Sequence, residues 1–142
     1  MSDPIIVGVD GSATARKAAE KARDLARNMQ APLHVVSAYT KEGIAHVKSG
    51  TDEWVISGAD PARDTAQAVV AELRSPGVEI RAAAAHGKPS EALIEYADRV
   101  SAQMIVVGNR GMRGVTRMLG SVANSVSHHA SCDVYIANTT AD

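Results

Sequence analysis

Residues 104–111, MIVVGNRG, set four apolar residues directly before a turn that contains two glycines. An apolar run without polar alternation is typical of a strand that is covered on both faces of a sheet. Glycine at the end of such a strand can adopt φ > 0 and carries no side chain, so the backbone N–H groups there can approach a ligand closely. Gly120 and Ser121 then predict the start of a helix, whose free N–H groups and positive dipole end favour an anion. We therefore expect a strand, an anion-binding turn and a helix, in that order.

The rest of the chain repeats this alternation of strand and helix. Apolar runs predict strands at residues 5–9, 33–39, 78–84, 103–107 and 133–137, and apolar residues at helical spacing predict four helices between them. Such an order demands a mostly parallel sheet with helices on both faces and right-handed crossovers. We expect one α/β domain over residues 1–142. Periodicity leaves two strand orders open: a flavodoxin-like order, and one that winds outward and then returns beside the first strand. The second brings Asp10 and Gly108 face to face.

Two further segments carry expectations about local structure. Residues 41–60 contain glycine and the only tryptophan, Trp54, and are weakly periodic, so we expect a long surface loop of the kind that often binds ligands. The first helix is expected to bury Ala18, Ala22, Leu25, Ala26 and Met29, with Asp10 or Ser12 as its cap.

Composition excludes several classes of protein. With 45% hydrophobic and 22% charged residues the chain has the composition of a globular domain. Fifteen basic and sixteen acidic residues give a net charge of -1, which disfavours a general nucleic-acid or membrane surface. One cysteine, Cys132, has no internal disulfide partner, and no apolar run or signal-peptide pattern suggests a membrane or secretion. We expect a cytoplasmic location.

Charge and motif spacing indicate a phosphate-bearing ligand. Residues 100–132 contain no acidic residue, while Arg110, Arg113 and Arg117 are basic. The glycines match neither the GxxxxGK[ST] phosphate loop nor the GxGxxG fingerprint, and no catalytic triad or HExxH pair is present. Besides capping the helix, Asp10 could have one of two roles: it could bind a Mg²⁺ ion that bridges phosphates, or it could accept a hydrogen bond from a ribose hydroxyl. The alternative explanation for the glycines is that they only form a tight turn and bind no ligand. A phosphoacceptor domain is a further alternative, but the chain lacks the clustered carboxylates that such a domain needs.

Two stretches resemble the universal stress protein family: residues 9–12, VDGS, and residues 107–122, which begin VGNRG and end GSV. The resemblance spans essentially the whole chain. It implies an open five-stranded parallel sheet of order 3-2-1-4-5. It also implies a homodimer through the last strand, to which Val134, Tyr135 and Ile136 belong.

The resemblance also implies an adenine-nucleotide site. The family's nucleotide-binding branch has the motif Gly-x2-Gly-x9-Gly-Ser, and here the second gap holds eight residues, 112–119. The implied site lies near Gly8, Val9, Asp10, Gly11, Ser12, Ala38, Val107, Gly108, Arg110, Gly111, Gly120, Ser121 and Val122. Val9 and Ala38 would face adenine, and Asp10 would hold any Mg²⁺ through the phosphates. The implied ligand is ATP, with cyclic AMP as the alternative. The implied role is that of a stress regulator without efficient catalysis, or of a ligand-free dimeric interaction protein.

Overall fold

The computed structural model describes residues 2–40, 45–49, 52–56, 59–109 and 119–139, with the backbone alone described between 45 and 60. Five parallel strands form the main sheet: β1 (Ile5–Gly8), β2 (Leu33–Tyr39), β5 (Ile80–His86), β6 (Met104–Gly108) and β7 (Asp133–Ala137). Their order is β5-β2-β1-β6-β7, which confirms the predicted 3-2-1-4-5 arrangement when these five strands are counted along the chain. The chain thus winds outward from β1 and returns to the other side of it.

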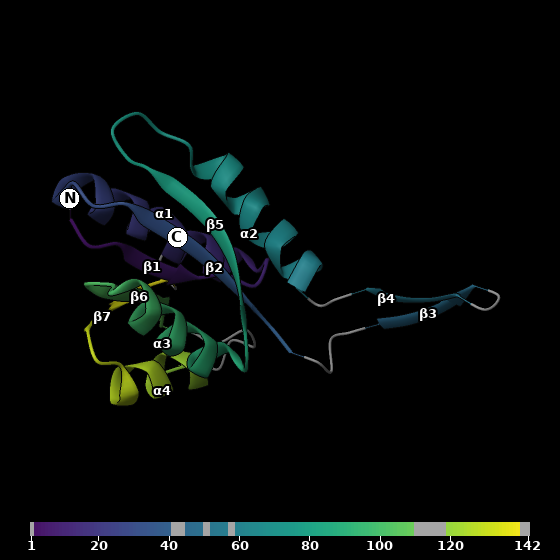
Figure 1. Ribbon diagram of the computed structural model, residues 1–142. Coiled ribbons are helices and arrows are strands. Elements are labelled where there is room, and N and C mark those ends of the chain that lie inside the picture. Colours follow the sequence, from purple (N-terminus) through teal and green to yellow (C-terminus); the bar gives the residue numbers. More distant parts are fainter. Residues whose placement is uncertain (1, 41–44, 50–51, 57–58, 110–118, 140–142) are drawn as a thin grey trace.

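Helices cover both faces of this sheet (Figure 1). The helices α1 (Ala13–Met29) and α2 (Ala59–Leu73) pack on one face, and α3 (Pro89–Val100) and α4 (Ser121–His129) pack on the other. Strand residues alternate between the two apolar layers: Ile5 and Val7 pack against α1, whereas Ile6 packs with α3 and α4, and all three are fully buried. Burial on both sides explains why β1 carries no polar alternation.

The expectation of a long loop at residues 41–60 was wrong. The strands β3 (Ala45–Ser49) and β4 (Asp52–Ile56) form an antiparallel pair with Val47 opposite Trp54, and this two-stranded sheet lies apart from the main one (Figure 1). Valine, isoleucine and tryptophan are good strand formers, and here they outweigh the glycines around them. The following helix begins at Ala59.

Two smaller expectations also need correction. The strand predicted at residues 78–84 runs from Ile80 to His86, because all seven residues of β2 find partners in it, from Leu33 opposite Ile80 to Tyr39 opposite His86. This pairing outweighs the weak strand preference of its alanines. Met29, expected on the buried face of α1, is 39% exposed because the helix ends there.

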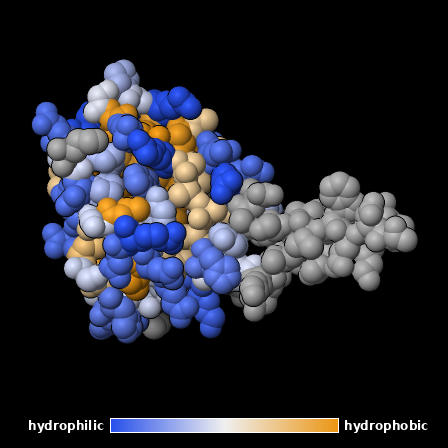
Figure 2. Space-filling view, in the orientation of Figure 1, coloured by the Kyte–Doolittle hydropathy of each residue, from blue (hydrophilic) through white to orange (hydrophobic). Residues whose placement is uncertain are grey.

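The coloured part of the face that Figure 2 shows is mostly hydrophilic. In Figure 2 apolar side chains form small patches between polar and charged ones, as expected where the outer sides of amphipathic helices face water. Within the described ranges, the helices lack the combination of length and apolar character that a bilayer crossing requires.

A histidine–tyrosine hydrogen bond ties the sheet to α3. The Nδ1 atom of His34 in β2 lies 2.8 Å from the hydroxyl oxygen of Tyr96. Burial lowers the pKa of His34, the positive charge of Arg81 lowers it further, and Glu79 opposes the shift. The folded state therefore favours the neutral ring.

We expect the substitution His34→Gln to reduce the loss of stability on mild acidification. A histidine with a depressed pKa in the folded state stabilises the fold above its unfolded pKa of about 6.5, and this contribution is lost as the pH falls toward the folded pKa. Glutamine can still bond Tyr96 but does not titrate. Urea unfolding at several pH values from about 8 to about 5 compares the stabilities of the two proteins. Parallel stability profiles would contradict the prediction.

Candidate functional site

A pocket of about 450 Å³ lies at the carboxyl ends of β1, β2 and β6. Here the chain changes its direction of winding, and in open α/β sheets ligands bind at such a switch point. The residues that line it come from both helix layers and from the strand ends. They are Gly8, Val9, Asp10, Ser12, Thr14, Ala15, Val36, Ser37, Ala38, Tyr39, Thr40, Pro61, Ala62, Thr65, Gly87, Pro89, Leu93, Val107, Gly108 and Val122.

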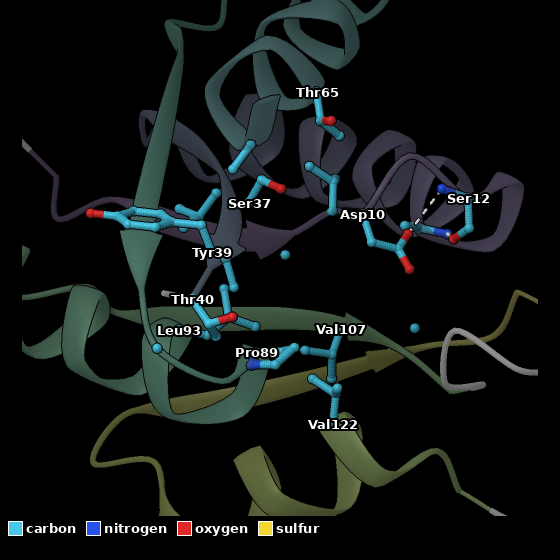
Figure 3. A pocket seen from close by; sticks show the side chains of 18 of the residues that line it. Asp10, Ser12, Ser37, Tyr39, Thr40, Thr65, Pro89, Leu93, Val107 and Val122 are labelled. Carbon is cyan, nitrogen blue, oxygen red and sulfur yellow. Dashed lines mark hydrogen bonds between the residues drawn. The ribbon is translucent and has the colours of Figure 1, made fainter. Parts of the chain in front are cut away.

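The pocket has one polar side and one apolar side (Figure 3). Asp10 and Ser12 lie before α1, and Thr65 on α2 lies on the same side of the pocket. Opposite them, Val107 on β6 and Val122 on α4 lie close to Pro89 and Leu93 at the start of α3; these four residues are called the apolar wall below. Such a division suits a ligand with a flat apolar part and a polar part.

The turn after β1 is held by its own polar groups. The backbone N–H of Ser12 donates to Asp10 Oδ1 at 2.9 Å, and Ser12 Oγ accepts from the N–H of Ala15 at 3.2 Å. Ser12 is therefore the N-cap of α1, while Asp10 stabilises the turn. Gly11 between them has φ of +88°, a conformation that glycine adopts without steric cost.

The glycines at the ends of β1 and β6 leave room for protein side chains. A Cβ on Gly8 would lie 2.7 Å from Leu93 Cδ1, and a Cβ on Gly108 would lie 3.2 Å from Thr139 Cγ2. The prediction that φ > 0 opens the turn was wrong at Gly108, because the strand continues through this residue and pairs it with Ala137. Gly11, Gly77 and Gly87 have positive φ in the described part of the chain.

The start of α4 offers an electropositive helix end beside the pocket. Its N-cap is Gly120, with no side-chain hydrogen bond, and its first turn contains no acidic residue. The helix carries Val122 into the pocket lining. Free N–H groups and the helix dipole favour a negative group at this end. Arg110 and Gly111, predicted to contact phosphates, lie outside the described residues.

The structure brings most of the predicted site together. Eight of the predicted residues line the pocket: Gly8, Val9, Asp10, Ser12, Ala38, Val107, Gly108 and Val122. Gly11 and Ser121 each adjoin a lining residue in the chain, and Gly120 precedes Ser121, but none of the three lines the pocket. Sequence reasoning missed Thr65 of α2 and Leu93 of α3, among others. These residues reach the pocket through packing of the crossover helices, for which the local sequence gave no signal.

Asp10 is the sole carboxylate among the described lining residues, which include no lysine, arginine or histidine. No group of three metal-ligating side chains is found in the described ranges. Mg²⁺ commonly binds through one or two carboxylates together with substrate phosphates and water. Asp10 therefore fits a cation that a phosphate-bearing ligand also holds, and it does not form a metal site alone.

The strand predicted to form the dimer, β7, is an edge strand of the sheet. β7 pairs with β6 on one side only in the described structure, and Val134, Tyr135 and Ile136 belong to it. Ile136 is 38% exposed. An edge strand of this kind offers unpaired backbone groups to a second chain.

Fold and pocket define a doubly wound parallel α/β protein with a ligand-sized cavity at the switch point of its sheet. The chain belongs to the universal stress protein family, whose model matches residues 1–138. A universal stress protein of Mycobacterium tuberculosis (strain ATCC 25618 / H37Rv) is 30% identical over 141 residues, covering 96% of each chain.

Solved structures of this family have the same fold. A universal stress protein in complex with cAMP is 26% identical, with a TM-score of 0.68, over 97% of this chain and 98% of that one. The universal stress protein from Archaeoglobus fulgidus in complex with dAMP is 26% identical, with a TM-score of 0.70, over 95% of this chain and 97% of that one.

Proposed function

We propose that this protein binds ATP in the pocket at the carboxyl ends of β1, β2 and β6 and acts as a regulator in a stress response. The observation that carries this proposal is the pocket itself, which joins an apolar wall, a carboxylate and the start of α4 at the switch point. The family membership and the cAMP and dAMP complexes of similar structures support an adenine nucleotide.

The family resemblance suggests how the nucleotide lies in this pocket. Adenine would lie near Val9 and Ala38, at the ends of β1 and β2, both of which line the pocket. The ribose would face Asp10, whose carboxylate can accept hydrogen bonds from hydroxyl groups. The phosphates would extend past Gly108 toward the start of α4, where backbone N–H groups favour negative charge.

We propose binding rather than efficient turnover. Phosphoryl transfer depends on positioned cations and a residue that orients the nucleophile. The described lining residues provide one carboxylate for these tasks. Slow hydrolysis of ATP with Mg²⁺ near Asp10 is compatible with this arrangement. We further propose a cytoplasmic homodimer that pairs through Val134, Tyr135 and Ile136 of β7.

Isothermal titration calorimetry with ATP, ADP, cyclic AMP and adenosine tests the proposed ligand. Saturable binding of ATP at one site per chain is expected. Mass spectrometry of small molecules that copurify with the protein identifies the ligand acquired in the cell. A folded protein that binds none of the four compounds would contradict the proposal and favour a ligand-free interaction protein.

Cyclic AMP is the second candidate ligand. The gap of eight residues between Gly111 and Gly120 is one shorter than in the family's nucleotide-binding motif, and a shorter segment suits a smaller anion. One similar structure is a complex with cAMP. Competition between ATP and cyclic AMP in the same calorimetric experiment distinguishes the two, because the preferred ligand displaces the other at lower concentration.

We expect Gly120→Val to weaken ATP binding by about tenfold, equivalent to about 1.4 kcal/mol, while leaving the fold intact. Gly120 has φ of -60° and ψ of 155°, an extended conformation that valine also adopts. The branched side chain would occupy space next to the phosphates. Calorimetry with ATP and adenosine measures the effect, and adenosine affinity should change little. Unchanged ATP affinity in a folded variant would argue against phosphates at this helix end.

A further inference from the structure

Asn109 joins three parts of the chain through its backbone and side chain. Its backbone N–H donates to the carbonyl of Ala137 at 2.9 Å, and its own carbonyl accepts from the N–H of Gly120 at 3.0 Å. Its side-chain Oδ1 accepts from the N–H of Thr139 at 3.0 Å and from the Thr139 hydroxyl at 2.9 Å. The end of β6, the residues after β7 and the N-cap of α4 thus meet at one asparagine.

Thr139 is built into this junction. It is 3% exposed, and its Cγ2 lies 3.2 Å from the position that a Cβ on Gly108 would occupy. The missing side chain of Gly108 therefore gives Thr139 the room to reach Asn109. Both donors of Thr139 point at the same amide oxygen, which fixes the orientation of the Asn109 side chain.

The junction acts on the end of the pocket where phosphates are proposed to bind. Gly108 lines the pocket and directly precedes Asn109, and Gly120 is the N-cap of the helix that carries Val122. The hydrogen bond from Gly120 to Asn109 sets the distance between these two backbone segments. Backbone groups bind an anion well only when they are held in the right geometry beforehand.

We propose that Asn109 is a positioning residue for the phosphate end of the pocket, and that Thr139 locks it in place from the C-terminal segment. The affinity for phosphates then depends on a residue that does not line the pocket and lies thirty positions away in the sequence. This inference rests on the proposed function, because it concerns the same nucleotide site.

The test compares Thr139→Val with Thr139→Ser. Valine keeps the shape of the side chain but removes the hydroxyl donor to Asn109, whereas serine keeps the hydroxyl. Calorimetry gives the affinities for ATP and for adenosine, which lacks phosphates. We expect Thr139→Val to weaken ATP binding about fivefold to tenfold, the effect of losing one hydrogen bond, while adenosine affinity changes less than about twofold. Thr139→Ser should bind ATP like the unmodified protein.

A second variant, Asn109→Gln, displaces the same acceptor by one methylene group and keeps the amide chemistry. The same ATP-selective loss is expected. An equal loss for ATP and adenosine would show a general structural role and overturn the inference, as would unchanged ATP affinity in either folded variant. If the unmodified protein itself binds neither compound, the proposed function fails. If it binds ATP and the folded variants bind it equally well, the positioning role alone fails.

Discussion

Gly8→Ala should lower the free energy of unfolding by about 1–3 kcal/mol, the usual cost of forcing an extra group into a packed core. The added Cβ would lie 2.7 Å from Leu93 Cδ1, closer than a Cβ normally approaches a non-bonded atom, and 3.1 Å from Leu93 Cδ2, which is also a tight contact. Leu93 is 3% exposed and packs in the layer between the sheet and the α3–α4 pair, so a shift away from the added group must disturb this packing or push the side chain into the pocket that it also lines.

The same substitution should become nearly neutral when Leu93 is also shortened. Leu93→Ala alone is expected to cost about 2–5 kcal/mol, because it leaves a cavity in the core. In that background the methyl group of Gly8→Ala enters the vacated space instead of a neighbour. The double mutant should therefore lose less unfolding free energy than the two single mutants lose together. Denaturant unfolding of the four proteins measures this difference, which is the coupling energy.

Gly108→Ala provides a matched control for this cycle. Its Cβ would contact Thr139 and Ala18 rather than Leu93. Leu93→Ala should therefore leave the cost of Gly108→Ala unchanged. Additive effects of Gly8→Ala and Leu93→Ala would contradict the interpretation that Gly8 exists to accommodate Leu93.

These glycines illustrate how far the sequence determines the site. Glycine at the end of a strand predicts close approach of something to the backbone, and at Gly8 and Gly108 that expectation is met by Leu93 and Thr139. Local sequence could not distinguish a ligand from a side chain, because Leu93 and Thr139 belong to other elements of the fold. At Gly11 the positive φ belongs to the turn itself, between two polar residues whose local hydrogen bonds the sequence could suggest.

The sheet was largely predictable because burial leaves a direct mark on the sequence. β1 and β6 are covered on both faces and consist of unbroken apolar residues, which indicated a parallel sheet with helices on both sides. Strand order depends on the direction in which the chain returns, and periodicity left it open; the family resemblance implied the order that the structure has. The pair of β3 and β4 was missed because its short strands form a sheet of their own, apart from the main core.

Asn109 shows what sequence reasoning could not reach at all. It directly follows the first glycine of the glycine-containing segment, yet its side chain accepts hydrogen bonds from Thr139, thirty residues further along the chain. This contact arises because β6 and β7 are parallel neighbours, with Gly108 opposite Ala137. No local pattern marks such a contact, whereas strand pairing makes it a consequence of the fold.

Asp10→Asn should abolish the gain in ATP affinity that Mg²⁺ is expected to give. The amide oxygen of asparagine can still accept the hydrogen bond from the Ser12 N–H, so the turn and the cap of α1 should persist. Without a divalent cation, removal of the carboxylate should strengthen ATP binding, because a negative charge near the phosphates is lost. With Mg²⁺, the unmodified protein should gain affinity through Asp10, and the variant should lack this gain of about tenfold, a modest charge interaction near a protein surface.

Calorimetry with ATP in excess Mg²⁺ and in EDTA measures all four affinities. Asp133→Asn is the matched control, because it removes the same charge at the start of β7, at the opposite end of the strands from the pocket. Identical Mg²⁺ dependence in the Asp10 variant and the unmodified protein would exclude Asp10 as a cation partner. The ribose role would then be tested with 2′-deoxy-ATP. If Asp10 accepts a hydrogen bond from the 2′-hydroxyl, the unmodified protein should prefer ATP to the deoxy compound, and Asp10→Ala, which removes the acceptor, should abolish that preference.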